Sequence, residues 1–299
     1  MILAQPFLRV VGHVDRRMLG AFQFVDAVTR LPVAVAAKVE VRRAALVNGA
    51  ADTGVPLHEG SVQIRQTQSA FHAILRAPFF DAYAASFVDP QDPPETLNRR
   101  LRLRLAVTNA GPHYLPREFQ FDLPRALDRT DAESVFRPRT VDLFRAPSAP
   151  VLGGWSVLRV RVTQVNTGAP LPGVLVRVFR SPRGTNDLPI GLGMSDWHGD
   201  LSGEALVAVA GLSRFRPGVG INVFETEQAI HFEATRDTDF SGAADQLPDL
   251  GGITVGTAPS IISRRSDQAD GLPPPLAVQP SAPLNVRAGR ESTIHLTMP

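Results

Sequence analysis

The stretch "VNTGAPLPGVLVRVFR", residues 165–180, joins a turn, two prolines and a run of β-branched residues in that order. Thr167 and Gly168 favour a tight turn between two strands, because glycine adopts left-handed conformations without steric cost. Pro170 and Pro172 fix φ and lack an N–H donor, so they suit the start of a strand or the edge of a sheet. The valine-rich run that follows predicts a strand. This stretch therefore predicts a β-sheet structure punctuated by rigid turns.

Strict alternation of polar and apolar residues extends this prediction along the chain. In "RRLRLRLAV" the residues Arg100, Arg102 and Arg104 fall on one face and leucines on the other. "WSVLRVRVTQV" alternates in the same way, with Arg159 and Arg161 on the outer face. This period of two is typical of strands with one buried face in an antiparallel sheet. The final run, "ESTIHLTM", predicts a further strand by the same pattern.

The strand-like runs fall into two groups, and 24 glycines and 26 prolines suit many short strands. We expect a mostly β fold of two antiparallel β-sandwich domains, immunoglobulin-like or transthyretin-like, with long loops and little helix. Residues 1–125 would form the first sandwich, residues 126–150 a connector, and residues 151–299 the second sandwich. A polar, proline-rich loop excursion would occupy residues 236–283. Short helical signals occur only near residues 79–87 and 131–135.

The motif "TGAPLPGVLVRVF" and the later "GMSDWHGDLSGEALVAV" together resemble the carboxypeptidase regulatory-like, or transthyretin-like, β-sandwich domain. In that family a Thr-Gly turn and a Pro-Leu-Pro-Gly kink lead into a valine strand, and a Thr-Asp-x-x-Gly turn precedes the next strand. Here Ser195, Asp196 and Gly199 stand at the second turn. The resemblance covers about residues 155–210, and "VRAGRESTIHLTM" is similar to the closing strand. It implies a sandwich fold for the second half.

The stretch "FVDAVTRLPVAVAAKVEV", residues 24–41, is similar to a weaker copy of the same motif. It lacks the glycine after its threonine and the second proline. Two sandwich domains remain the best account of the chain despite these departures.

Composition excludes several classes of protein. With 43% hydrophobic and 20% charged residues, the 299-residue chain is globular and long enough for two cores. The absence of cysteine excludes a disulfide scaffold, a thiol nucleophile and a cysteine-ligated metal. The net charge is only +2 and Lys38 is the sole lysine, so we expect no nucleic-acid partner.

No uncharged apolar stretch approaches the ~18 residues of a membrane span. The N-terminal residues lack the pattern of a signal peptide. We therefore expect no membrane span, and a localisation that is cytoplasmic or within an assembled particle.

Catalytic motifs are missing from the sequence. It contains no nucleophile elbow, phosphate-binding loop, dinucleotide fingerprint or HExxH helix, and its seven histidines are scattered. We expect no enzyme activity, no catalytic residues, no cofactor and no metal.

Two acidic groups could in principle hold a metal. Asp196, His198 and Asp200 alternate within one turn, where a hairpin in which Asp accepts backbone donors is the favoured interpretation. The second group lies in a glycine-rich stretch, where a solvated loop is favoured over a calcium site. Its members are Asp237, Asp239, Asp245 and Asp249.

The arginine rows are candidates for a protein interface. Like charges at positions i and i+2 repel each other unless acidic groups lie opposite. Those groups could come from another subunit or from a neighbouring strand of the same chain, and a plain solvent face is the alternative. The candidate interface residues are Arg100, Arg102, Arg104, Arg159 and Arg161.

An aromatic group beside a proline-rich loop fits core packing and a docking patch equally well. Its members are Phe79, Phe80, Tyr83 and Phe87.

These features predict a non-enzymatic structural or adaptor component of a multi-subunit assembly, such as a phage tail-like particle or a contractile injection system. Such machines are largely built from cysteine-free β-sandwich modules, and the partners would be other protein subunits, including copies of this chain. The alternative is a ligand- or carbohydrate-binding β-sandwich module. Such a module would favour exposed tryptophan and tyrosine side chains, and the chain contains only two of each. An enzyme accessory domain or hydrolase is the third possibility, disfavoured by the missing motifs.

Overall fold

The computed structural model contains almost only β-structure, as the sequence predicts. It describes residues 18–33, 37–48, 51–67, 71–80, 100–126, 129–151, 155–180, 188–209, 227–237, 239–243, 246–248, 261–265, 284–287 and 289–298. Within these residues the helical structure is confined to a single 3₁₀ turn, η2, Gly199–Leu201. The described residues contain no helix long and apolar enough to cross a membrane.

The first half of the chain forms two four-stranded sheets. One has the order β4-β5-β1-β8, with strands Gln63–Gln66, Phe71–Arg76, Gly20–Asp26 and Arg139–Leu143. The other has the order β3-β2-β6-β7, with strands Ala51–Val55, Lys38–Asn48, Arg100–Asn109 and Arg117–Leu123.

The two sheets enclose one hydrophobic core. Leu101, Leu103 and Leu105 of β6 are fully buried in it, as the alternating pattern predicts. Phe22 of β1 packs edge-on against Phe119 of β7, with ring centroids 5.1 Å apart. Aromatic and leucine side chains from opposite sheets thus hold the first half together.

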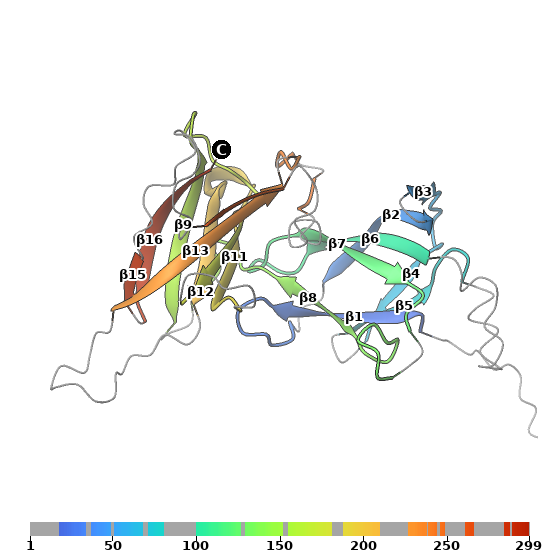
Figure 1. Ribbon diagram of the computed structural model, residues 1–299. Helices are drawn as coiled ribbons and strands as arrows, with labels where there is room; N and C mark the ends of the chain where they lie inside the picture. The colour runs from blue at the N-terminus through green and yellow to red at the C-terminus, as the bar shows by residue number, and fades with distance from the viewer. Residues whose placement is uncertain are drawn as a thin grey trace, which may run out of the picture.

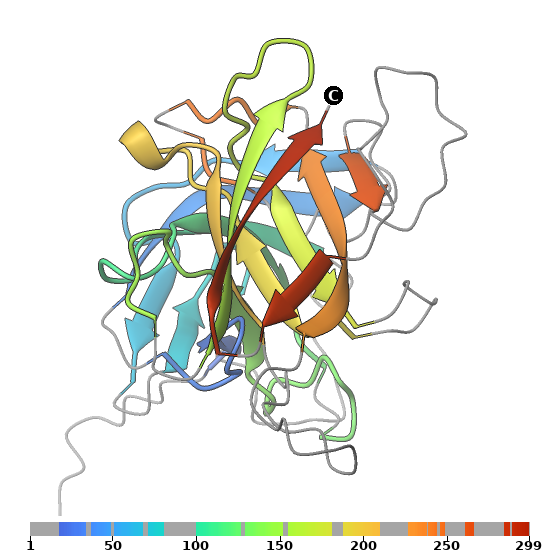
Figure 2. The same cartoon turned by 90° about the vertical axis from the view of Figure 1, so that its left-hand side faces the viewer.

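The second half forms one eight-stranded sheet with the order β14-β13-β10-β11-β12-β9-β16, and β15 also pairs with β13. The strands in chain order are β9 Ser156–Gln164, β10 Leu175–Phe179, β11 Gly191–Met194, β12 Glu204–Val209, β13 Glu227–Asp237, β14 Ile261–Arg265, β15 Leu284–Arg287 and β16 Glu291–Met298. Val176 and Ile230, on β10 and β13, share one core with Val160 and Ile294, on β9 and β16, although β11 and β12 separate the two pairs of strands in the sheet. The sheet therefore curls around its own interior (Figure 2).

The halves have the same strand connectivity. The order β4-β5-β1-β8 corresponds to β11-β12-β9-β16, and β3-β2-β6-β7 corresponds to β11-β10-β13-β14. In the second half β11 pairs with both β10 and β12, so a single strand joins what are two separate sheets in the first half.

One feature of the sheets differs from the expected antiparallel arrangement. In each half the last strand runs parallel to the first, as β8 does to β1 and β16 to β9. Period-2 patterns report which face of a strand is buried and carry no information on the direction of its neighbour.

The expected connector and loop excursion also contain strands. Residues 126–150 contribute β8, which completes the first sheet. Within residues 236–283 lies β14, which pairs with β13. Both strands are only five residues long and are flanked by charge, proline or glycine, so their sequences resemble loops. Tyr83 and Phe87 lie outside the described residues.

The two halves lie side by side and are joined by a third hydrophobic cluster (Figure 1). Leu115 and Phe144 from the first half pack there with Trp197 and Phe240 from the second. The rings of Trp197 and Phe240 meet edge-on at 5.7 Å. The N–H of Glu118 on β7 also donates to the carbonyl of Pro248, at 3.1 Å. This junction packs both halves into one body.

Candidate interaction surfaces

The turn that opens the resemblance motif is held by its own backbone. Gly168 has φ of 68° and donates its N–H to the carbonyl of Gln164 at 2.8 Å. Gln164 donates in turn to Ala169, and the hydroxyl of Thr167 accepts from the N–H of Ala169 at 3.2 Å. Pro170 then forms a bridge with Thr163 across the turn.

The first half contains the same turn. Arg30 has φ of 60° and donates its N–H to Asp26, which donates to Leu31, both at 2.9 Å. The hydroxyl of Thr29 accepts from Leu31, and Pro32 forms a bridge with Val25. Arg30 stands where the second turn has Gly168, so a bulky residue takes the left-handed conformation there. The two turns therefore share the same backbone hydrogen bonds and the same bridge to a proline.

The polar side chains of the second motif, around "SDWHG", also form hydrogen bonds to the backbone of the fold. The hydroxyl of the fully buried Ser195 accepts from the N–H of Val174 and donates to the carbonyl of Leu171, each at 2.8 Å. Asp196 Oδ1 accepts from the N–H groups of Trp197 and His198 at 2.7 and 2.9 Å. This is the favoured hairpin turn, in which the carboxylate satisfies backbone donors.

No group of three histidine, aspartate or glutamate side chains in the described part of the chain is placed to hold a metal ion. Asp200 is exposed beside the turn. In the second acidic group, Asp237 accepts the N–H of Asp239 at 3.0 Å, while Asp245 and Asp249 lie outside the described residues.

The arginine row on β6 meets acidic groups of the same chain. Arg102 contacts Asp122 of β7 and Asp52 of β3, each at 3.2 Å. Hydrogen bonding to Asp122 raises the pKa of Arg102 above its usual value. Arg100 and Arg104 are exposed on the same face. Intramolecular carboxylates thus offset part of the repulsion within the row.

The row on β9 lies in the other half. Arg159 contacts Glu291 of β16 at 2.5 Å and donates to the carbonyl of Pro147 at 2.8 Å. It therefore ties the segment between the halves to the second sheet. Arg161 is exposed and lies opposite Glu204 and His295 in the register of the sheet. The structure does not bring the two predicted rows together.

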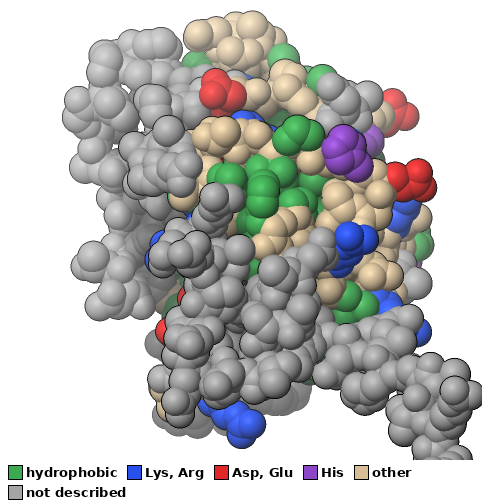
Figure 3. Space-filling model, turned by 90° about the vertical axis from the view of Figure 1, so that its right-hand side faces the viewer, with side chains coloured by type: hydrophobic (Ala, Val, Ile, Leu, Met, Phe, Trp, Pro, Cys, Tyr) green, Lys and Arg blue, Asp and Glu red, His purple; other side chains and the backbone are tan. Residues whose placement is uncertain are grey.

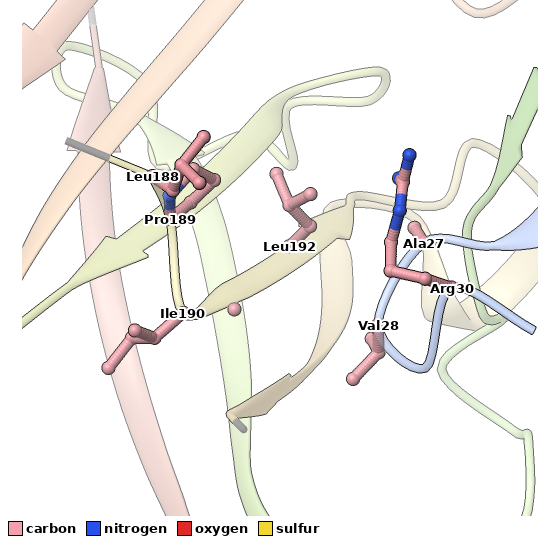
Figure 4. Close-up of a pocket in the computed structure, with 8 residues that line it drawn as sticks. Ala27, Val28, Arg30, Leu188, Pro189, Ile190 and Leu192 are labelled. Carbon is pink, nitrogen blue, oxygen red and sulfur yellow. The ribbon is translucent and has the colours of Figure 1, made fainter. Parts of the chain in front are cut away.

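An apolar groove of about 580 Å³ opens at the rim of the junction. The turn with Ala27, Val28 and Arg30 faces the stretch that carries Ile190 and Leu192 (Figure 4). Leu188, with 86% of its surface exposed, and Pro189 also line it. Sequence patterns do not find this groove, because its walls come from different halves and each contributes only a few apolar residues.

A buried ion pair fixes one wall of the groove. Asp26 accepts from Tyr114 at 3.0 Å and contacts Arg145 at 2.8 Å. Burial alone would raise the pKa of Asp26, but hydrogen bonds from the N–H groups of Thr29 and Val28 and the charge of Arg145 lower it. Burial and the neighbouring Asp26 raise the pKa of Tyr114 to about 12. This wall is therefore held from both the turn and the segment after β8.

A second apolar patch lies at the far end of the first half. Hydrophobic side chains gather there among acidic, basic and histidine side chains (Figure 3). In the aromatic group singled out from the sequence, Phe80 is buried, while Phe79 is 41% exposed and has φ of 71°.

No family model matches the chain. Comparison with curated proteins and with solved structures also finds no match. Any role of the candidate surfaces is therefore inferred from their geometry alone.

Proposed function

We propose that the protein is a non-enzymatic structural or adaptor subunit of a multi-subunit assembly, such as a phage tail-like particle or a contractile injection system. In this proposal each half is a transthyretin-like β-sandwich domain. The shared strand order of the halves and their matching turns support that assignment. The partners are other protein subunits, and the protein works without a cofactor in the cytoplasm or within the particle.

The observation that carries the proposal is the groove at the rim of a packed junction. Leu188 is 86% exposed and Leu31, next to Arg30, is 64% exposed, while Ile190 and Leu192 are half-buried. Exposed apolar surface rimmed by polar groups marks sites that another chain covers. Meanwhile the polar side chains of the motifs, Ser195 and Asp196, are engaged in the fold itself.

Sedimentation of gently lysed source cells tests this role. The wild-type protein should travel with large particles, whereas a Leu188→Glu and Ile190→Glu double variant should remain near the top of the gradient. The matched control is Phe136→Glu, which alters a side chain that is 56% exposed and does not line the groove. Its protein should still travel with the particles. A wild-type protein that sediments as a small monomer contradicts the proposal.

The groove also favours one alternative, the binding of a small apolar ligand. Its volume of about 580 Å³ falls in the range of ~300–1,000 Å³ typical of ligand pockets. In that case the purified chain should bind a fluorescent fatty-acid probe with one-to-one stoichiometry, and the double variant should not. Absence of saturable binding excludes this alternative.

A further inference from the structure

In the first half β8 is an edge strand of its sheet, and side chains and a loop cover the edge of β8 that faces away from β1. Arg117 of β7 donates to the carbonyl of Asp142 on β8, and Arg139 of β8 donates to the carbonyl of Gln120 on β7, both at 2.6 Å. The N–H of Leu115 donates to the carbonyl of Phe144, the residue that follows β8, at 2.9 Å. These contacts occupy carbonyl groups that a further strand would need as acceptors.

In the second half β16 holds the position of β8, because it is the last strand and runs parallel to the first (Figure 2). The N–H groups of Val157 and Val165 on the β9 side donate to the carbonyls of Arg290 and Met298. In a parallel pair of strands, every second residue of a strand directs both its N–H and its C=O towards the neighbouring strand, and the residues between direct theirs away from it. Ile294 and Leu296 therefore bond to β9.

The intervening residues, Thr293, His295 and Thr297, direct their N–H and C=O groups to the free side of β16. Among the described residues none forms a hydrogen bond with these outward groups. Their side chains lie on the exposed face of the strand. Within the described part of the second half, the edge of the eight-residue strand β16 therefore lacks the closure that protects the first half.

We propose that β16 pairs antiparallel with β16 of a second copy of this chain, joining two curled sheets across a two-fold axis. A register centred on His295 places Thr293 opposite Thr297 of the second copy, and Ile294 opposite Leu296. Threonine pairs and aliphatic pairs are favourable across strands. The two imidazoles at the centre each carry a donor and an acceptor nitrogen when neutral, so they can hydrogen-bond to each other.

The side chains of this register are self-complementary, and this property favours a second copy as the occupant of the edge. Ile294 is buried and Leu296 half-buried at the margin of the core. The pairing would cover Leu296 and continue the core from one copy into the next. The inference deepens the proposed assembly role by naming one partner, and it is tested on the purified chain alone.

The first test is the mass of the purified chain across a concentration series, measured by light scattering after size exclusion. The wild type should be a dimer that dissociates on dilution. His295→Pro removes one outward N–H and leaves the bonds to β9 intact, so it should be a folded monomer with an unchanged circular dichroism spectrum. His295→Thr retains the N–H and should remain a dimer.

Cross-linking tests the register, because the chain contains no cysteine. His295→Cys places a single thiol on the two-fold axis, where paired residues have Cα atoms ~5.5 Å apart, a distance that a disulfide spans. Oxidation should link two copies. Thr293→Cys places its thiols far from each other and should not cross-link, whereas the Thr293→Cys and Thr297→Cys double variant should.

A wild-type chain that stays monomeric at high concentration overturns the proposal. Cross-linking of Thr293→Cys as fast as that of His295→Cys also overturns it, because the copies would then meet in another register. Either result leaves the sedimentation test of the proposed function unaffected, so the two failures are distinguishable.

Discussion

Two glycines of the second half illustrate how single residues set local stability. Gly168 and Gly173 have φ of 68° and 66°. A Cβ on Gly168 would have no atom within 4 Å, whereas a Cβ on Gly173 would lie 2.4 Å from the ring of Phe240. The first glycine is favoured for its backbone conformation alone, and the second also for the close approach of the junction core.

Replacing each glycine with alanine should separate these two effects. Gly168→Ala should lower the free energy of unfolding by ~1–2 kcal/mol, the cost of a left-handed L-residue. Gly173→Ala should cost a further ~1–3 kcal/mol, because Phe240 must move. Urea denaturation of the two variants measures the difference. Equal losses would show that the contact with Phe240 is unimportant for stability.

His72 is a second residue whose effect is local. It is buried on β5, and its ring stacks on Phe22 with centroids 5.1 Å apart. Burial lowers the pKa of His72 below its ordinary value of 6.5. Below that pH the unfolded chain binds a proton that the folded chain binds less readily, so this contribution to stability is present above pH 6.5 and is lost as the pH falls.

The wild-type melting temperature should therefore decline as the pH falls from 7 towards 5. His72→Leu should flatten this decline, since it removes the buried titrating group. The measurement is a series of thermal melts over that range for both proteins. A variant that declines as steeply as the wild type would assign the acid sensitivity to other groups.

At the scale of elements, strands with strictly alternating sequences form as their patterns predict. In β6 the leucines are buried and Arg100 and Arg104 are exposed. In β16 Ile294 and Met298 are buried while Thr293, His295 and Thr297 are exposed. Gly289 has φ of 74° and its N–H donates to the hydroxyl of Ser156, so a fixed turn precedes β16.

Ending the chain after Ala288 should destabilise the second half. The loss removes two buried side chains, Ile294 and Met298, each worth ~1.5–3 kcal/mol, and exposes the edge of β9. Differential scanning calorimetry of the shortened and full-length chains measures the change. A shortened chain that melts at the full-length temperature would show that β16 contributes nothing to the stability of the sheet.

At the scale of the whole molecule, the junction packs two similar halves against each other. The only two tryptophans lie near it. Trp197 packs on Phe240, and Arg145 stacks over Trp155 at 4.7 Å. Their fluorescence therefore reports on the contact between the halves.

Phe240→Ala should uncouple the halves. Truncating a buried phenylalanine typically costs ~3–5 kcal/mol, and here the loss falls on the junction, so unfolding should split into two calorimetric transitions. The tryptophan emission should shift to the red in the first of them. The matched control, Phe136→Ala, alters an exposed side chain outside the junction cluster and should keep the wild-type profile. A single transition in both variants would mean that the remaining junction contacts couple the halves without Phe240.

The sequence by itself determined those features whose cause is local. The buried and exposed faces of β6 and β16 follow from the alternation of side chains along each strand. The two threonine turns and the β character of the chain follow from the backbone preferences of a few neighbouring residues. The acceptor role of Asp196 is likewise decided within its own turn. The alternation within β6 also places Arg102 on the polar face of its strand, but it does not say which acidic residues lie beside it.

Only the tertiary structure decided which strands meet. The parallel partners of β1 and β9, the short strands β8 and β14, and the ion pairs of Arg102 and Arg159 join residues that are far apart in the sequence. The same holds for the groove, whose walls come from different halves. Local patterns specify which face of a strand is apolar, but the choice of neighbour depends on how all apolar faces are buried together, and that condition acts on the chain as a whole.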